Sequence, residues 1–278
     1  MKKILLIIVF IALNTISYGK NDAAIDWLNG KIISIGNSHM SIDEEGAPID
    51  IETNQALSIS EARNISYERS REKALINAIN AICAIQVDSE KKIADLIKAD
   101  PVVRKNIYEI LSKNSIYRDV TSNYLISSCK LELNTGYLTE IINYQFPKDN
   151  FPIQDNIEIS TLYSSIIIDV RGLSIKPMLI PAIINENGLE IYNKNFINPD
   201  DAIKYNVVSY VYTEKDAMKH KKAGKNPLFC VALKNVNGNP VISDSDVKKI
   251  FSHKKNIEYL KKCRVIFIID RLRHESDW

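Results

Sequence analysis

The sequence predicts an α+β protein in which an N-terminal α+β domain is followed by a C-terminal α/β layer domain. Three observations lead to this fold class. A long helical pattern starts near Ser58, with apolar residues at steps of three and four. Strand-like segments flank this pattern in the first half of the chain. In the second half, short helical patterns alternate with apolar strands, an order typical of α/β layers.

The N-terminus has the three-part pattern of a secretory signal peptide. Lys2 and Lys3 form a positive start, residues 4–13 are an unbroken apolar run, and small residues precede a cut between Gly19 and Lys20. The apolar run is shorter than the roughly 20 residues that span a bilayer. We therefore expect a periplasmic protein from which residues 1–19 have been removed. No cysteine directly follows the run, so a lipid anchor there is not expected.

Length and composition set the limits for the remaining chain. The 278 residues allow two domains of about 100–200 residues each. A proline-containing segment at 147–155 is the expected linker, so we divide the chain into residues 20–147 and 148–278. The net charge of +2 does not indicate a nucleic-acid partner. No second apolar run reaches membrane length, and we expect no transmembrane span in the mature chain.

The first domain is expected to begin with a strand over residues 26–36, followed by a loop. Ser58 and Glu61 have the spacing of a capping box, which predicts a long helix. A helix capped by Asp88 and Ser89 and a helix opened by Pro101 are predicted next. The β signals at 116–133 predict strands. Residues 137–146 read as a strand or as a helix-like segment.

The second domain opens with the stretch SIIIDVRGLSIKPMLIPAIINENGLEIY, residues 165–192. Residues 165–170 predict a buried strand, which is followed by a bend. Because proline cannot donate to a ladder, the next strand should be an edge or carry a bulge at the two prolines. A turn over residues 185–188 then lets the chain pair back. The residues that define this structural motif are Asp169, Arg171, Gly172, Pro177, Pro181, Gly188 and Tyr192.

Further elements complete an alternating pattern. We expect strands at 207–212 and 227–233, a short helix at 214–222, and one helix from Ser243 or Asp244 to about Lys262. The final apolar run at 264–270 is typical of a buried central strand.

Few residues of the sequence indicate a catalytic or metal-binding site. The four histidines, His39, His220, His253 and His274, lack metal-ligand spacing, and the chain has no glycine-rich phosphate loop or nucleophile elbow. We therefore expect no catalytic, metal or cofactor site. The four cysteines allow bridges 83–129 and 230–263, or they are buried thiols.

Two charged features have a functional and a structural interpretation. Asp169 and Asp270 each end an apolar run, and on adjacent parallel strands they would form an acidic site at one sheet edge. Alternatively, each carboxylate binds the turn that follows it or a neighbouring arginine. The run KHKKAGK at 219–225 is either an anion-binding patch or a solvated helix end that stops at Gly224.

Several small-residue motifs carry a family resemblance: WLNGK near Gly36, the Ala62-Arg63 pair before a helix with Ala74 and Ala78, and the closing RVIFIID. The first domain resembles the twenty-kilodalton LPP lipoproteins and the N-terminal domain of the FlgT-type flagellar H-ring protein. The second resembles an uncharacterised domain of exported bacterial proteins. The chain lacks the lipidated cysteine of the lipoproteins, which argues against anchoring in the outer membrane. We expect a periplasmic location, with the outer-membrane periphery as the alternative that the resemblance implies.

Two functions of different class follow. The resemblance implies a non-catalytic structural or interaction protein of the bacterial cell envelope, with envelope or flagellar basal-body proteins as partners and self-assembly as a further option. The alternative is a periplasmic small-ligand-binding protein or hydrolase that uses an acidic crevice at Asp169 and Asp270.

Overall fold

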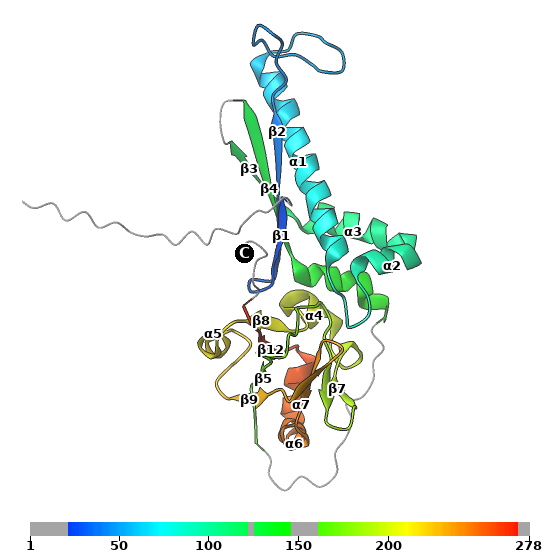
Figure 1. The fold of residues 1–278 in the computed structure, drawn as a ribbon, viewed down its shortest axis with the longest axis vertical. Coiled ribbons are helices and arrows are strands. Elements are labelled where there is room, and N and C mark those ends of the chain that lie inside the picture. Colours follow the sequence, from blue (N-terminus) through cyan, green and yellow to red (C-terminus); the bar gives the residue numbers. More distant parts are fainter. Residues whose placement is uncertain (1–21, 122–124, 146–160, 272–278) are drawn as a thin grey trace, which may run out of the picture.

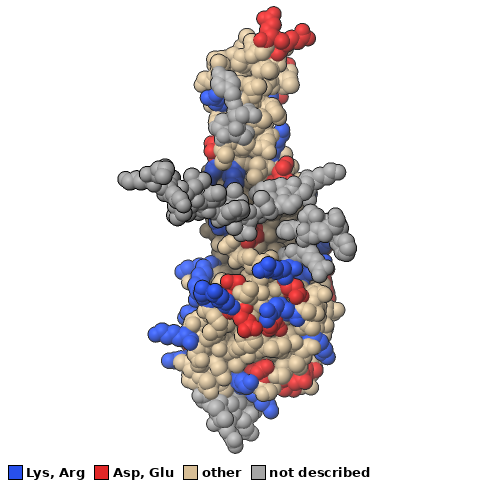
Figure 2. Space-filling model, turned by 60° about the vertical axis from the view of Figure 1, so that its left-hand side comes forward, with Lys and Arg blue, Asp and Glu red and all other residues tan. Residues whose placement is uncertain are grey.

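The computed structural model describes residues 22–121, 125–145 and 161–271 (Figure 1). The predicted signal peptide and linker therefore lie outside the described residues. The chain has an α+β fold, as the sequence predicts. The first domain points its long helix and strands away from the second domain (Figure 1), and acidic side chains gather at its far tip (Figure 2).

The first domain contains a four-stranded antiparallel sheet. Its strand order is β1-β2-β4-β3, with β1 at Ala23–Asp26, β2 at Lys31–His39, β3 at Ile116–Thr121 and β4 at Ile126–Asn134. The prediction of one strand over residues 26–36 was wrong, because a turn interrupts it. The carboxylate of Asp26 accepts a hydrogen bond from the N–H of Asn29, and Gly30 adopts the left-handed region at φ +62°.

Helix α1 (Ile59–Ala84) covers one face of this sheet (Figure 1). Ser58 and Glu61 form the predicted capping box. The helix approaches β2 closely because the contact residues are small. A Cβ added to Gly36 would lie 2.0 Å from the carbonyl oxygen of Ser70 and 2.3 Å from the amide nitrogen of Ala74. This contact holds helix and sheet together as one unit.

Three shorter helices complete the first domain: α2 (Ile93–Ala99), α3 (Pro101–Asn114) and the 3-10 helix η1 (Thr135–Gln145). Helix α3 begins at Pro101, as predicted, with Asp100 as its cap. Helix α2 starts later than predicted, because the Asp88 carboxylate instead closes a turn with two following N–H groups. Helix η1 settles the alternatives for residues 137–146 in favour of a helical segment.

The second domain contains two sheets. The first is parallel, with the order β8-β12-β5-β9, and the second has the order β10-β11-β6-β7. Strand β12 is buried between two neighbours, which confirms the predicted central strand. The strands are β5 Ser165–Asp169, β6 Ile183–Asn185, β7 Glu190–Tyr192, β8 Ser209–Val211, β9 Pro227–Val231, β10 Lys234–Val236, β11 Asn239–Ile242 and β12 Val265–Ile268.

The helices of this domain are short. They are η2 Lys194–Phe196, α4 Pro199–Tyr205, α5 Glu214–Lys219, α6 Asp244–Phe251 and α7 Lys254–Lys261. The single helix predicted over residues 243–262 is therefore two helices. The break lies at Ser252, whose hydroxyl donates to the carbonyl of Lys249, and at His253, whose ring caps α7. The helix predicted to reach Lys222 ends at Lys219. Within the described ranges, no helix is long and apolar enough to cross a bilayer.

The proline segment differs from its prediction. Pro177 and Pro181 lie in an irregular connection, and the next strand, β6, is an internal strand between β11 and β7. Between the prolines, the chain pairs with the first domain: the N–H of Leu179 donates to Gln86 (3.0 Å) and that of Ile180 donates to Val87 (2.8 Å). The edge alternative was therefore wrong, while β6 has a register shift between Ile183 and Ile184, just after Pro181.

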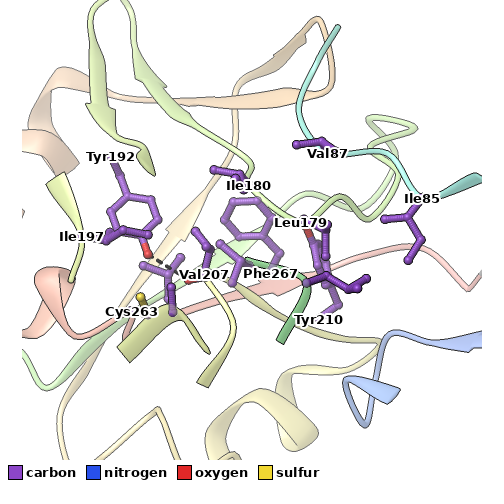
Figure 3. Packing of buried hydrophobic residues seen from close by; sticks show 14 of the residues in the cluster. Ile85, Val87, Leu179, Ile180, Tyr192, Ile197, Val207, Tyr210, Cys263 and Phe267 are labelled. Carbon is purple, nitrogen blue, oxygen red and sulfur yellow. Dashed lines mark hydrogen bonds between the residues drawn. The ribbon is translucent and has the colours of Figure 1, made fainter. Parts of the chain in front are cut away.

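The hydrophobic core is continuous across the two domains. Ile85 and Val87, which follow α1, lie beside Leu179 and Ile180, and buried Tyr210 packs in the same cluster (Figure 3). Because apolar side chains fill the junction, the two domains are joined by packing as well as by the chain.

Candidate functional site at the domain junction

The main candidate site is a cavity of about 590 Å³ between the two domains. The first domain contributes the β1–β2 turn and the chain around the end of α1. The second contributes the segment around Pro177 and the β10–β11 turn. The lining residues are Ile25, Trp27, Ala84, Ile85, Gln86, Asp88, Ser89, Lys92, Ser174, Lys176, Pro177, Met178, Asn235, Asn237 and Gly238.

Aromatic packing fixes the wall beneath this junction cavity. The ring of Trp27 meets Tyr210 edge-on, with ring centroids 5.7 Å apart, and Tyr210 meets Phe267 in the same way at 5.9 Å. The Tyr210 hydroxyl donates to the carbonyl of Met178 (2.8 Å) and accepts from its N–H (3.0 Å). These two hydrogen bonds attach the segment between Pro177 and Pro181 to strand β8 of the parallel sheet.

The chemistry of the junction cavity suits binding better than catalysis. Its volume falls within the range of small-molecule sites, and its lining combines apolar walls with scattered polar groups. The polar groups include two lysines, Lys92 and Lys176, and one carboxylate, Asp88. The lining contains neither histidine nor cysteine.

Asp169 ends β5 and Asp270 follows the end of the adjacent parallel strand β12, which is the arrangement that the acidic-site hypothesis requires. Each carboxylate has a structural partner. Asp169 binds the guanidinium of Arg171, which holds the pKa of this carboxyl below its ordinary value, and Arg171 also pairs with Glu214 at 3.2 Å. Asp270 accepts from the N–H of Gly172 at 2.9 Å. On the face of the second domain that Figure 2 shows, acidic and basic side chains are intermixed.

The other motif residues shape turns or fill the core. Gly172 and Gly188 have φ values of +79° and +82°, as their bends require. Tyr192 is fully buried, and its hydroxyl donates to the carbonyl of Val207 at 2.8 Å (Figure 3). None of these three residues lines the junction cavity.

The lysine run differs from the expected solvated helix end in two ways: α5 ends at Lys219 rather than at Gly224, and one lysine of the run is buried. Lys222 is only 4% exposed, and its Nζ donates to the carbonyl oxygen of Asn206 at 3.0 Å. Burial lowers the pKa of Lys222 to about 7 and that of the neighbouring His220 to about 4. Sequence patterns gave no sign of this burial, because the groups around Lys222 come from distant segments.

Histidines and cysteines do not converge on a site. Within the described part of the chain, no three histidine, cysteine or acidic side chains are placed to hold a metal ion. The four cysteines are free thiols rather than bridges; Cys129, Cys230 and Cys263 are buried, as the second alternative expects, whereas Cys83 is half-buried. Burial raises the pKa of Cys230 and of Cys263 to about 12, so these thiols are poor nucleophiles.

Comparison with known proteins concerns the second domain. Residues 165–271 match the family model of the second domain of Treponema pallidum Tp0624. The match extends from β5 to just beyond β12 and so covers both sheets of this domain. No curated protein matches the chain.

Proposed function

We propose that this chain is an exported structural or interaction protein of the bacterial cell envelope. The observation that carries the proposal is an apolar edge strand in the second domain. Strand β9 pairs with β5 on one side, and no other strand of the described ranges pairs with its outer side. The signal-peptide pattern at residues 1–19 supports export.

The side chains along β9 are unusual for an open edge. Phe229, Val231 and the following Leu233 are between 39% and 59% exposed. They alternate with buried Leu228, Cys230 and Ala232, so they project from the same face. Proteins commonly protect open edges with lysine or proline, because unpaired N–H and C=O groups invite pairing, and β9 has such a residue only at its first position, Pro227. An apolar open edge is therefore suited to a partner.

We infer that the partner adds an extended segment to β9. Strand addition supplies backbone hydrogen bonds, and the exposed side chains supply apolar contact. The resemblance to envelope families narrows the expected partners to flagellar basal-body or outer-membrane proteins. The partner can also be a second copy of this chain, which would then supply the added strand and lead to self-assembly through the same edge.

The experiment places a photo-reactive amino acid at Val231 in living cells, with Glu258 on exposed helix α7 as the matched control. Irradiation should give a discrete adduct from position 231 and none from position 258. The adduct should contain an envelope protein or a second copy of the chain. It should disappear when Phe229→Lys, on the same exposed row, is introduced. Fractionation of the same cells should recover the protein in the periplasm or membranes.

Two results would contradict the proposal. The first is recovery of the protein in the cytoplasm of cells that fractionate cleanly. The second is adduct formation that is equal at positions 231 and 258, because it would reflect random collision rather than strand addition.

A second candidate function is small-ligand binding in the periplasm. The observation that favours it is the junction cavity of about 590 Å³, rather than an acidic crevice at Asp169 and Asp270. Ligands from a metabolite extract should change the fluorescence of Trp27, which lines this cavity. The Met178→Phe variant, which adds a ring to the cavity wall without adding a second indole, should weaken binding. An unchanged spectrum with the whole extract would remove this candidate.

A further inference from the structure

A second pocket, of about 440 Å³, lies within the second domain. We call it the Lys222 pocket. Helix α4 contributes two residues, the chain after α5 contributes two, and the α7–β12 connection contributes two. The lining residues are Asp201, Tyr205, Lys221, Lys222, Lys262 and Arg264.

The Lys222 pocket is strongly cationic. Four of its six lining side chains are lysine or arginine, and Asp201 is the single carboxylate. Within the described residues, none of these four cations forms an ion pair with an aspartate or glutamate. Surface lysines without a carboxylate partner are common, but four cations around one concavity create a local positive potential that attracts anions.

Lys222 is the most unusual of the four, because it is buried without a counter-charge. Its Nζ makes one hydrogen bond, to the carbonyl oxygen of Asn206 at 3.0 Å. An ammonium group has three donors, so two N–H groups are available to a ligand. A buried charge is costly unless it is paired, and its lowered pKa reflects that cost. A bound anion would supply the missing partner.

Two other cations are held in position by aromatic rings. The guanidinium of Arg264 lies 4.8 Å from the ring centre of Tyr259 and donates to the Ser164 carbonyl at 3.4 Å. The Nζ of Lys221 lies 5.8 Å from the ring centre of Tyr205. Such contacts restrict long side chains before a ligand arrives, which reduces the entropy lost on binding.

We propose that the Lys222 pocket binds the phosphate group of a small phosphorylated compound. Four cations against one carboxylate favour a multiply charged anion over a single carboxylate. The planar fork of Arg264 matches the spacing of phosphate oxygens. The volume exceeds what a lone phosphate needs, and Asp201 and Tyr205 offer hydrogen-bonding groups to a polar, uncharged part of the same compound.

The test is calorimetric titration of the purified protein at pH 7 with pyrophosphate, inorganic phosphate and citrate. Pyrophosphate should bind more tightly than citrate. Lys221→Gln and Lys262→Gln replace exposed side chains and should fold, which circular dichroism checks. Each should weaken pyrophosphate binding by about tenfold, since a charge-assisted hydrogen bond is lost.

Lys225→Gln is the matched control. Lys225 belongs to the same lysine run and is exposed, but it does not line the pocket. The same change of charge there should alter affinity by less than about twofold, within the range of a distant screened charge. A second variant, Arg264→Gln, should weaken binding at least as much as Lys221→Gln.

Three outcomes would overturn the proposal. One is the absence of binding by both phosphate probes at millimolar concentration. Another is an equal loss with Lys225→Gln, which would indicate diffuse attraction to the lysine run. The third is tighter binding of citrate than of pyrophosphate, which would assign the pocket to carboxylates.

Discussion

The Nζ of Lys222 lies 3.0 Å from the carbonyl oxygen of Asn206, and this bond links a buried cation to the domain junction. The side chain of Asn206 accepts a hydrogen bond from Thr135 of the first domain at 3.1 Å. Asn206 also has a left-handed backbone, with φ +61°. One residue therefore contacts the Lys222 pocket through its backbone and the first domain through its side chain.

The lowered pKa of Lys222 predicts that stability increases with pH. Between about pH 7 and the ordinary lysine pKa of 10.5, the unfolded chain binds a proton that the folded chain does not. The contribution of Lys222 to the free energy of unfolding should therefore rise from pH 7 to pH 9, by about 2 kcal/mol. The titratable and charged groups around Lys222 are Tyr192, Asp201, Tyr205, His220, Lys221, Lys262, Cys263 and Arg264.

Chemical denaturation in an anion-poor buffer at pH 7, 8 and 9 checks this prediction. Lys222→Met keeps the length of the side chain and removes its titration, so the variant should lack the rise. The buried thiols of Cys230 and Cys263, with pKa raised from 9.0 to about 12, oppose the trend from about pH 8 upward in both proteins, so the difference between the two profiles isolates Lys222. Parallel profiles for the two proteins would show that Lys222 is charged in the folded state.

The opposite pH dependence is expected at Glu132 on β4. Its carboxylate binds Lys130 at 2.7 Å and Lys31 at 3.2 Å, which lowers its pKa to about 2. This stabilisation is present above the ordinary pKa of 4.5 and is lost as the pH falls toward 2. Because both lysines are partly exposed, Glu132→Gln should cost about 1–2 kcal/mol at pH 7.

Urea denaturation at pH 7, 4 and 3 measures the cost of Glu132→Gln. The difference from the wild type should shrink steadily toward acid. Glu109, on the surface of α3, forms ion pairs that are more exposed, and Glu109→Gln should change stability by less than about 0.5 kcal/mol. A difference that is constant with pH would assign the effect to packing.

Gly36 should tolerate no side chain, because α1 lies directly on β2 there. A Cβ would lie 2.0 Å from a backbone oxygen of α1, so Gly36→Ala should force the helix away and cost about 1–3 kcal/mol or more. Gly188→Ala is the control: Gly188 has positive φ but open space around it, so only backbone strain of about 1 kcal/mol is expected. Thermal unfolding ranks the two variants, and equal losses would contradict the close contact.

The Tyr210 hydroxyl should contribute more to the free energy of unfolding than an ordinary surface hydroxyl does. Tyr210→Phe leaves the N–H and carbonyl of Met178 without their partner in a buried position, which should cost about 1–3 kcal/mol. Tyr212→Phe, two residues later and only partly buried, should be nearly neutral. Guanidinium unfolding provides the comparison. A neutral Tyr210→Phe would mean that water replaces the hydroxyl.

Local features of the fold could be predicted from the sequence, because neighbouring residues determine them. The capping box at Ser58 and Glu61 and the Asp100–Pro101 helix start depend on contacts within one turn. The parallel adjacency of β5 and β12 is different, because the sequence raised it only as a condition of the acidic-site hypothesis and the structure supplies it through a long-range contact.

Non-local features could not be predicted in this way. The segment between Pro177 and Pro181 has the composition of an edge strand, but its partner, Gln86 and Val87, is about ninety residues away in the chain. Lys222 is similar: an alternating lysine run indicates a solvated surface, and only the packing of α4 and of the α7–β12 connection buries one member. The candidate site depends on such long-range contacts.

The pairing of Leu179 and Ile180 with the first domain also bears on how the second domain can be used alone. If residues 161–271 were expressed in isolation, these two N–H groups would lose their acceptors, and apolar Ile180 would lose Ile85 and Val87 beside it. The isolated domain would expose an apolar segment with unpaired N–H groups between Pro177 and Pro181. It would tend to dimerise or aggregate there, although its own sheets were intact.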